Sequence, residues 1–212
     1  MAFLLPEGRR SLSAYAYHIG PSHTYQPAYR FIAADIGIEH GAWLDLGTGT
    51  GWLAIHAGAG KSDLDVIAID TSETMLSLAE TNKAGRLNVT FRKMSADDVI
   101  FPAGTFTVVT AVQLFHHLGA ERAKVLSEAH RTLVDGGKMY IYEADPDSEV
   151  PSDWVSRRAG WPTDGVLKGR WKKYGMDQAA WDQLKRDVEA SPFGTNYTDE
   201  RHGFYRRLVC TR

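Results

Sequence analysis

Short apolar runs alternate with longer segments of helical period through most of the chain. The apolar runs are rich in Val, Ile and Leu, and they predict strands at residues 42–46, 64–69, 89–93, 107–112 and 138–142. Apolar positions at helical spacing predict helices at residues 52–59, 73–83 and 122–134. Strands that alternate with helices in this way form a sheet of parallel strands joined by crossover helices.

Two segments with other patterns flank this core. Residues 1–41 are aromatic and polar, and a helix is expected there from about 27 to 36. Residues 145–195 contain several Gly and Pro breaks and close with an amphipathic helix around Trp181, and two short strands follow around Gly203. We therefore expect one domain over residues 1–212, made of an N-terminal cover (1–41), a core (42–144), a cap (145–195) and a terminal strand hairpin (196–212).

The composition limits the classes of protein to consider. With 212 residues the chain can form one sizeable core, and 43% hydrophobic and 24% charged residues argue against a largely disordered chain. A formal net charge of −2 supplies no general positive field, so nucleic acid and anionic membranes are not expected partners. A single cysteine cannot form an internal disulfide, and no apolar stretch approaches the ~18 residues of a membrane span. The sequence predicts a soluble cytoplasmic protein.

A glycine-rich loop follows the first predicted strand. Residues 44–52 read Leu-Asp-Leu-Gly-Thr-Gly-Thr-Gly-Trp, a strand that runs into three alternating glycines and then a helix. Glycines accept positive φ and carry no Cβ, so this backbone can lie against a ligand at the carboxyl end of the strand. The third glycine of the dinucleotide fingerprint G-x-G-x-x-G would fall on Trp52, which argues against a nicotinamide cofactor. The carboxylate of Asp45 instead suits the amino group of an amino-acid ligand.

A second carboxylate, Asp70, ends the second predicted strand. An acid at this place accepts hydrogen bonds from both hydroxyls of a ribose that lies across the strand ends. Its other interpretation is a helix cap for the segment that begins at Ser72 or Glu73. A ribose together with an amino acid is the outline of S-adenosylmethionine.

Four motifs stand in order along the chain, at residues 45–51 (DLGTGTG), 68–76 (AIDTSETML), 106–118 (FTVV to LFHHL) and 131–138 (RTLVDGGK). In these motifs the sequence resembles the class I S-adenosylmethionine-dependent methyltransferases of the small-molecule type, the group that contains the ubiquinone and menaquinone methyltransferases. The resemblance implies an α/β, Rossmann-like fold: a seven-stranded sheet, mostly parallel with an antiparallel last strand, and helices on both faces. It also implies S-adenosyl-L-methionine as cofactor and a small molecule as methyl acceptor.

The resemblance assigns cofactor contacts to particular positions. Asp45 and the glycine loop would hold the methionine part, and Asp70 the ribose. The residues expected to bind the cofactor are Asp45, Gly47, Thr48, Gly49, Gly51, Asp70, Thr71, Met75, Ser95, Ala96, Asp97, Tyr17 and Tyr25. Where the family usually has an Asp on the adenine amino group, this chain has Ser95-Ala96-Asp97, so Ser95 or Asp97 makes that contact, or Asp97 caps a turn.

Methyl transfer from a sulfonium is an in-line displacement, so the protein mainly aligns donor and acceptor and excludes water. A base is needed only if the acceptor must lose a proton. His116 and His117, after the fourth predicted strand, and Glu143, after the fifth, are the candidate catalytic residues, and histidine titrates near neutrality. The alternative is that these side chains pack or cap the next helix. No metal site is expected.

The flanking segments bear on the acceptor. Tyr17 and Tyr25 are expected in a lid over the cofactor, because Gly20-Pro21 and Pro27 interrupt any regular helix there. Residues 157–173 hold six basic side chains against one acid and two tryptophans, which would suit a flat, aromatic or anionic acceptor unless they form a solvated face. Three other functions stay open: an S-adenosylmethionine-binding protein without catalytic activity, a nucleotide-dependent oxidoreductase and an RNA methyltransferase.

Overall fold

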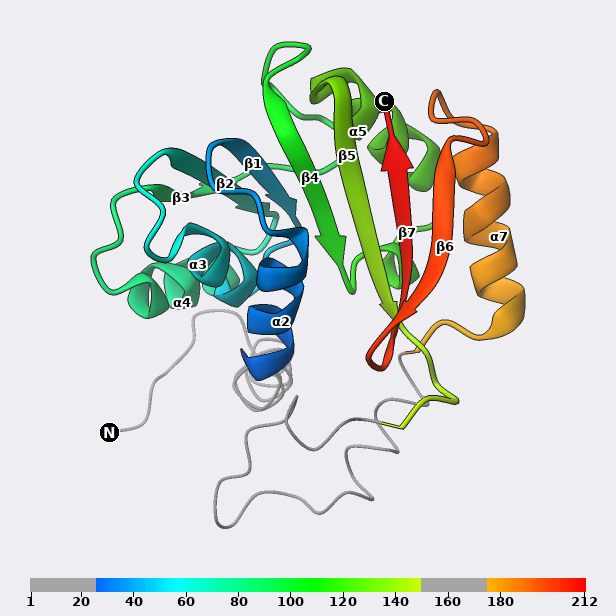
Figure 1. Cartoon of the computed structure of the whole chain (residues 1–212), viewed down its shortest axis with the longest axis horizontal. Coiled ribbons are helices and arrows are strands. Elements are labelled where there is room, and N and C mark those ends of the chain that lie inside the picture. Colours follow the sequence, from blue (N-terminus) through cyan, green and yellow to red (C-terminus); the bar gives the residue numbers. More distant parts are fainter. Residues whose placement is uncertain (1–25, 150–174) are drawn as a thin grey trace.

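The structure is a computed structural model that describes residues 26–149 and 175–212. The described residues form one sheet of seven strands in the order β3-β2-β1-β4-β5-β7-β6 (Figure 1). The strands are β1 (Gly41–Leu46), β2 (Leu64–Asp70), β3 (Val89–Lys93), β4 (Phe106–Val112), β5 (Leu133–Ala144), β6 (Tyr197–His202) and β7 (Tyr205–Thr211). The helices are α2 (Gln26–Ile36), α3 (Trp52–Gly58), α4 (Glu73–Lys83), the 3-10 helix η1 (Phe115–His117), α5 (Arg122–Thr132) and α7 (Gln178–Glu189).

The direction of the strands confirms the expected Rossmann-like α/β sheet. Neighbouring strands from β3 to β5 pair in parallel, whereas β7 lies antiparallel to both β5 and β6. The chain builds outward from β1 through β2 to β3, and then returns to place β4 on the other side of β1. Ligands of open α/β sheets bind beyond the carboxyl ends of the strands at such a reversal. The sheet therefore places its binding edge beyond β1 and β4.

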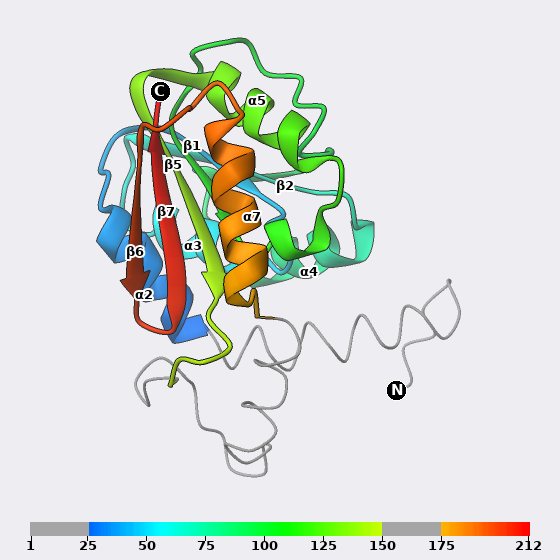
Figure 2. The same ribbon diagram turned by 90° about the vertical axis from the view of Figure 1, so that its right-hand side faces the viewer.

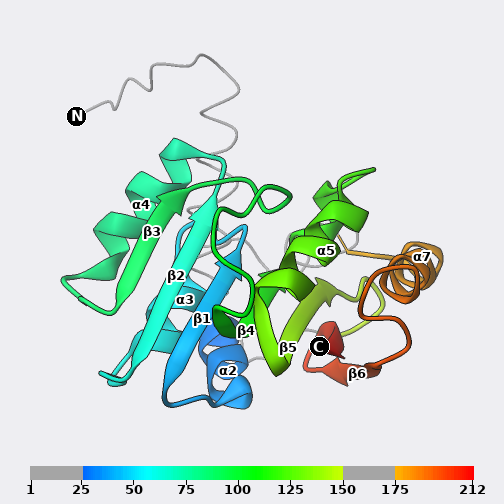
Figure 3. The same ribbon diagram turned by 90° about the horizontal axis from the view of Figure 1, so that it is seen from above.

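Helices cover both faces of the sheet (Figures 2 and 3). α2 and α3 pack on one face around buried residues that include Trp43 and Val108. α5 and α7 pack on the other face around Leu44 and Val109. Because successive strand residues point to opposite faces, strands that are apolar without alternation supply both cores.

The fifth strand is longer than the sequence predicts. β5 begins at Leu133 rather than at residue 138, and α5 accordingly ends at Thr132 rather than at residue 134. The pairing of β4 with β5 shifts register between Phe106 and Val108, and Gly136 has a φ of 76°. Since glycine accepts that conformation, the Gly136-Gly137 pair forms an irregularity inside the strand.

Parts of the flanking segments lie outside the described residues, including Tyr17 and Tyr25 of the cover and residues 157–173 of the cap. Where these segments are described, α2, α7 and the β6–β7 hairpin around Gly203 form as predicted. A search of the described helices finds none with the length and apolar character needed to cross a bilayer.

Candidate cofactor-binding and active site

Polar side chains gather at the carboxyl ends of the central parallel strands. β1 contributes Asp45, β2 ends in Asp70, and β5 contributes Glu143 close to its own end. Asp45 lies in register with Thr110 of the adjacent β4. In Figure 1 the arrowheads of β4 and β5 point to this edge of the sheet. Residues that are up to about a hundred positions apart in the chain are thus brought to one edge.

The glycine loop between β1 and α3 has the backbone that the sequence predicts. Gly47, Gly49 and Gly51 have φ values of 66°, 55° and 81°, in the left-handed region that favours glycine. A Cβ at Gly47 would lie 2.8 Å from Leu114 Cδ1, and one at Gly51 would lie 2.6 Å from Phe91 Cζ. A Cβ at Gly49 would meet nothing within 4 Å. Packing therefore requires the first and third glycines, whereas the second keeps the backbone accessible to a ligand.

Asp70 fastens this loop to β2. Its Oδ2 accepts a hydrogen bond from the backbone N–H of Gly49 at 2.9 Å, and its Oδ1 accepts one from the N–H of Ser72 at 2.9 Å. The N-cap of α4 is Ser72, whose hydroxyl accepts from the N–H of Met75 at 3.4 Å, so Asp70 is not that cap. Each carboxylate oxygen has a second lone pair. Asp70 therefore keeps the acceptors that two ribose hydroxyls require.

Asp45 is the most deeply buried acid near the loop. Its side chain is 2% exposed, and its Oδ1 accepts a hydrogen bond from the Thr110 hydroxyl at 2.7 Å. Burial raises the pKa of Asp45 to about 6, although the nearby hydroxyls of Thr48 and Thr110 lower it, and the charge of Asp70 raises it further. Its Oδ2 has no partner in hydrogen-bonding geometry within the described ranges. Asp45 therefore has one oxygen left for a cationic ligand group.

The residues expected around adenine lie at the ends of β2 and β3. Met75 is buried in α4, and Thr71 is exposed just before that helix. In the Ser95-Ala96-Asp97 segment, the Ser95 hydroxyl donates to the Asp97 carboxylate, and this bond lowers the pKa of Asp97. Lys124 Nζ lies 3.9 Å from Asp97 Oδ2. Ser95 and Asp97 contact each other, so the structure is compatible with either of them as the residue that contacts adenine.

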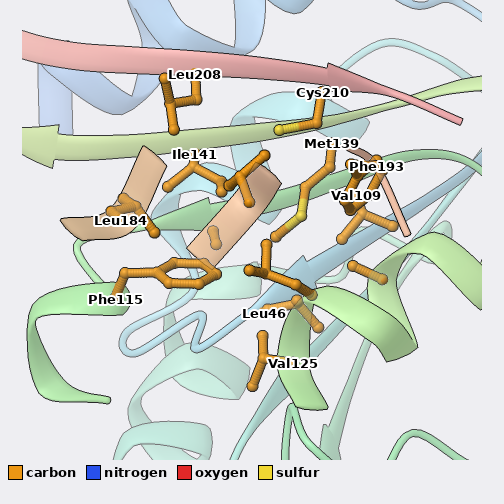
Figure 4. Close-up of a cluster of buried hydrophobic side chains, with 14 of the residues drawn as sticks. Leu46, Val109, Phe115, Val125, Met139, Ile141, Leu184, Phe193, Leu208 and Cys210 are labelled. Carbon is orange, nitrogen blue, oxygen red and sulfur yellow. The ribbon is translucent and has the colours of Figure 1, made fainter. Parts of the chain in front are cut away.

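His116 and Glu143 form a close pair at the ends of β4 and β5. The fully buried Glu143 places Oε2 2.8 Å from His116 Nδ1. Its Oε1 accepts hydrogen bonds from the backbone N–H of Phe115 at 2.6 Å and of His116 at 3.4 Å. The Phe115 ring lies in the core beneath α5 and α7 (Figure 4), which fixes η1 in place. His117 is exposed. The centroid of its ring lies 3.8 Å from the centroid of the His116 ring.

Sequence reasoning missed Gln113, which directly follows β4. Its φ is +58°, a conformation that costs a residue other than glycine about 1–2 kcal/mol. Its backbone N–H donates to Tyr142 O at 2.8 Å, and its buried carboxamide nitrogen lacks a partner in the part of the chain that the structure describes. Strained backbone of this kind is typical of functional sites. No local signal predicts it, because glutamine has no preference for positive φ.

The residues at this edge fit S-adenosylmethionine. Asp45 Oδ2, Gln113 Nε2 and His116 Nε2 are buried polar atoms without partners among residues 26–149 and 175–212, although most buried polar atoms are paired. A ligand ammonium group suits the free carboxylate oxygen, the bare backbone at Gly49 admits the amino-acid part, and Asp70 suits a ribose. Over the same two ranges, no group of three or more His, Cys, Asp or Glu side chains could hold a metal ion.

Comparisons with known proteins agree with this geometry. The profile of the family described as "Methyltransferase domain" matches residues 44–141. A demethylmenaquinone methyltransferase of Thermus thermophilus is 33% identical over 121 residues, which are 56% of this chain and 54% of that protein. One of Clavibacter sepedonicus is 30% identical over 149 residues, 70% of this chain and 58% of that protein. Over residues 44–141 the chain is thus similar to the methyltransferase domain family and to these methyltransferases.

The chain spans about half the length of the curated relatives that it matches. A crystal structure of a Methanococcus maripaludis protein described as an S-adenosyl-L-methionine-dependent methyltransferase superimposes with a TM-score of 0.76 at 17% identity, covering 100% of this chain and 97% of that one. An Aquifex aeolicus methyltransferase structure gives a TM-score of 0.62 at 18% identity, covering 94% and 97%. At these identities the two structures show that the chain shares their fold.

Proposed function

We propose that this protein transfers a methyl group from S-adenosylmethionine to a small-molecule acceptor by in-line displacement. One observation carries the proposal: the unpaired oxygen of Asp45, the bare backbone at Gly49 and the carboxylate of Asp70 meet at one edge of the sheet. The names of the relatives give demethylmenaquinone as their substrate, which favours an aromatic acceptor here. A cytoplasmic location is part of the proposal, since the single cysteine, Cys210, is buried and unpaired.

Each residue has a separate task. Asp45 would accept hydrogen bonds from the ligand's ammonium group, Gly49 would admit its methionine part, and Asp70 would accept from its ribose hydroxyls. Bound S-adenosylmethionine supplies a methyl group on a positively charged sulfur. The residues of the chain orient the two reactants and keep water away from them.

His116 is the group that we propose removes a proton from the acceptor. When its Nδ1–H donates to Glu143, the lone pair of the neutral imidazole lies on Nε2, which is buried. A neutral imidazole can take the proton of a phenolic hydroxyl or of an acidic C–H. The electron pair left on the acceptor atom would then form the bond to the methyl carbon, and the carbon–sulfur bond would break with its electrons staying on sulfur. We assign this role to His116 and none to His117, whose side chain is exposed.

Calorimetric titration of the full chain with S-adenosylhomocysteine tests the cofactor assignment. We expect binding in the range of about 1 μM to 1 mM, the usual range for enzyme ligands, and no heat with NADH. Heat with NADH and none with S-adenosylhomocysteine would contradict the proposal. Incubation with labelled S-adenosylmethionine and a panel of hydroxyaromatic molecules then distinguishes an enzyme, which labels a product, from a binding protein without activity.

Replacing Gly49 with valine should abolish S-adenosylhomocysteine binding, because the side chain would occupy the ligand's place on the loop. Gly60→Val is the matched control, since Gly60 also has a positive φ, 74°, and an added Cβ there meets nothing within 4 Å. Both variants carry similar backbone strain, so thermal unfolding should shift alike in the two. Equal loss of binding in both variants, measured by titration, would show that strain rather than a blocked loop is responsible.

Replacing Gln113 with glycine should stabilise the ligand-free protein by about 1 kcal/mol, because glycine accepts its positive φ without strain. The same change should weaken ligand binding, because the buried carboxamide is lost. Ala84, which has a φ of 50° at the end of α4, provides the control: Ala84→Gly should stabilise similarly and leave affinity unchanged. Unaltered S-adenosylhomocysteine affinity in Gln113→Gly would remove Gln113 from the site.

A further inference from the structure

A chain of three buried side chains leads from the core to the candidate ligand site. The indole Nε1–H of Trp43 donates to Thr110 Oγ1 at 2.8 Å, and the Thr110 hydroxyl donates to Asp45 Oδ1 at 2.7 Å. Trp43 and Thr110 are 0% exposed and Asp45 is 2% exposed. The proposed cofactor contacts do not require these hydrogen bonds from Trp43 to Thr110 and from Thr110 to the Asp45 carboxylate.

The chemistry of the donors fixes the direction of this chain. An indole N–H can only donate, so it occupies a lone pair of the Thr110 oxygen and turns the hydroxyl proton toward another acceptor. Asp45 Oδ1 at 2.7 Å is a better acceptor than Leu44 O at 3.5 Å, both by distance and by charge. Oδ1 is therefore engaged, and Oδ2 is the oxygen that remains for a ligand.

We propose that Thr110 and Trp43 are positioning residues that hold the Asp45 carboxylate ionised and oriented, with Oδ2 toward the ammonium group of the amino-acid part of the ligand. This inference rests on the proposed function, because it takes S-adenosylmethionine as the ligand. The inference adds selectivity for one group of the ligand: Trp43, Thr110 and Asp45 recognise its ammonium group, whereas Asp70 binds its ribose. The ligands affected are those that carry an α-amino group.

A purely structural role for the chain makes a different prediction. Trp43 belongs to the core beneath α2 and α3, and Thr110 joins β4 to β1, so loss of either could loosen the sheet. Such loosening would weaken the binding of all ligands at this edge. Comparing two ligands that differ only in the amino-acid part separates the two roles.

The experiment measures the binding of S-adenosylhomocysteine and of 5′-methylthioadenosine, which keeps the adenosine and lacks the amino acid. In Thr110→Val, an isosteric change, we expect S-adenosylhomocysteine to bind about 10–50-fold more weakly, the scale of a lost charge-assisted hydrogen bond. The affinity for 5′-methylthioadenosine should stay within about twofold. Thr110→Ser, which restores the hydroxyl, should recover most of the affinity, and Trp43→Phe should show a smaller, roughly threefold loss for the amino-acid ligand alone.

Thr132→Val is the matched control, because Thr132 is also fully buried and its hydroxyl bonds to carbonyl oxygens of α5, away from the site. Equal losses for the two ligands in Thr110→Val and Trp43→Phe, or no loss in either variant, would overturn the positioning role. If Thr110→Val does not fold, Trp43→Phe carries the same comparison between the two ligands. Wild-type protein that binds neither ligand would instead refute the proposed function itself.

Discussion

Exchanging Glu143 for glutamine is expected to lower turnover by about 10²–10⁴-fold, the contribution of a general base, with little change in S-adenosylhomocysteine affinity. The carboxylate Oε1 accepts from two backbone N–H groups of η1, so the glutamine oxygen will take that place. The glutamine NH₂ then faces His116 Nδ1 and can only donate to it. His116 must move its proton to Nε2, and the lone pair proposed to accept the acceptor's proton is lost.

The same pair explains how the charge of the reaction is accommodated. Bound S-adenosylmethionine would supply a positively charged sulfur, and after transfer the positive charge would be on His116, whose Nδ1 lies 2.8 Å from Glu143 Oε2. Because Glu143 is fully buried, few water molecules compete for this contact. Glu143 acts through His116 and is therefore a positioning residue, whereas His116 would touch the acceptor.

Two measurements check this prediction. Nitrogen-15 NMR of the His116 ring needs no acceptor, and it should report the Nδ1–H tautomer in the wild type and the Nε2–H tautomer in Glu143→Gln. Turnover is measured with whichever hydroxyaromatic molecule the wild type methylates. Glu39→Gln and His40→Gln, exposed changes before the amino-terminal end of β1, are the controls. Normal turnover in Glu143→Gln, or an unchanged tautomer, would refute the role of the pair.

The sequence predicted the parts of this molecule that depend on local patterns. Strand and helix positions follow from hydrophobic period, and the loop follows from three glycines whose positive φ values only glycine adopts readily. The hydrogen bonds between side chains at the site could not be predicted, because they join residues far apart in the sequence. Trp43 bonds to a threonine 67 residues away, and the same threonine bonds to Asp45 across 65 residues. Such contacts depend on strand order and register, which a single sequence pattern does not specify.

Replacing Asp45 with asparagine is expected to make the ligand-free protein more stable at pH 8 while weakening ligand binding. Burial raises the pKa of this carboxyl from 3.8 to about 6, so the folded state binds its proton more tightly than the unfolded state does. The contribution of Asp45 to stability is therefore fully present below about pH 4 and is lost as the pH rises through about 6, a change of about 3 kcal/mol for this carboxylate. A neutral amide avoids this cost, which gives an expected gain of about 1–3 kcal/mol.

Thermal unfolding and titration against pH test both halves of this trade between stability and binding. At pH 8 the asparagine variant should melt about 3–10 °C above the wild type, and the difference should shrink toward pH 4, where the wild-type carboxyl is protonated.

Wild-type affinity for S-adenosylhomocysteine should fall as the pH drops through about 6, because a protonated Asp45 no longer attracts an ammonium group. The variant should bind at least about tenfold more weakly at pH 8 and lose this pH dependence. Asp65→Asn, an exposed change on β2, should alter neither property. A buried charge that binds no ligand only destabilises the fold. Unaltered affinity in Asp45→Asn would therefore contradict the role of Asp45 in ligand binding.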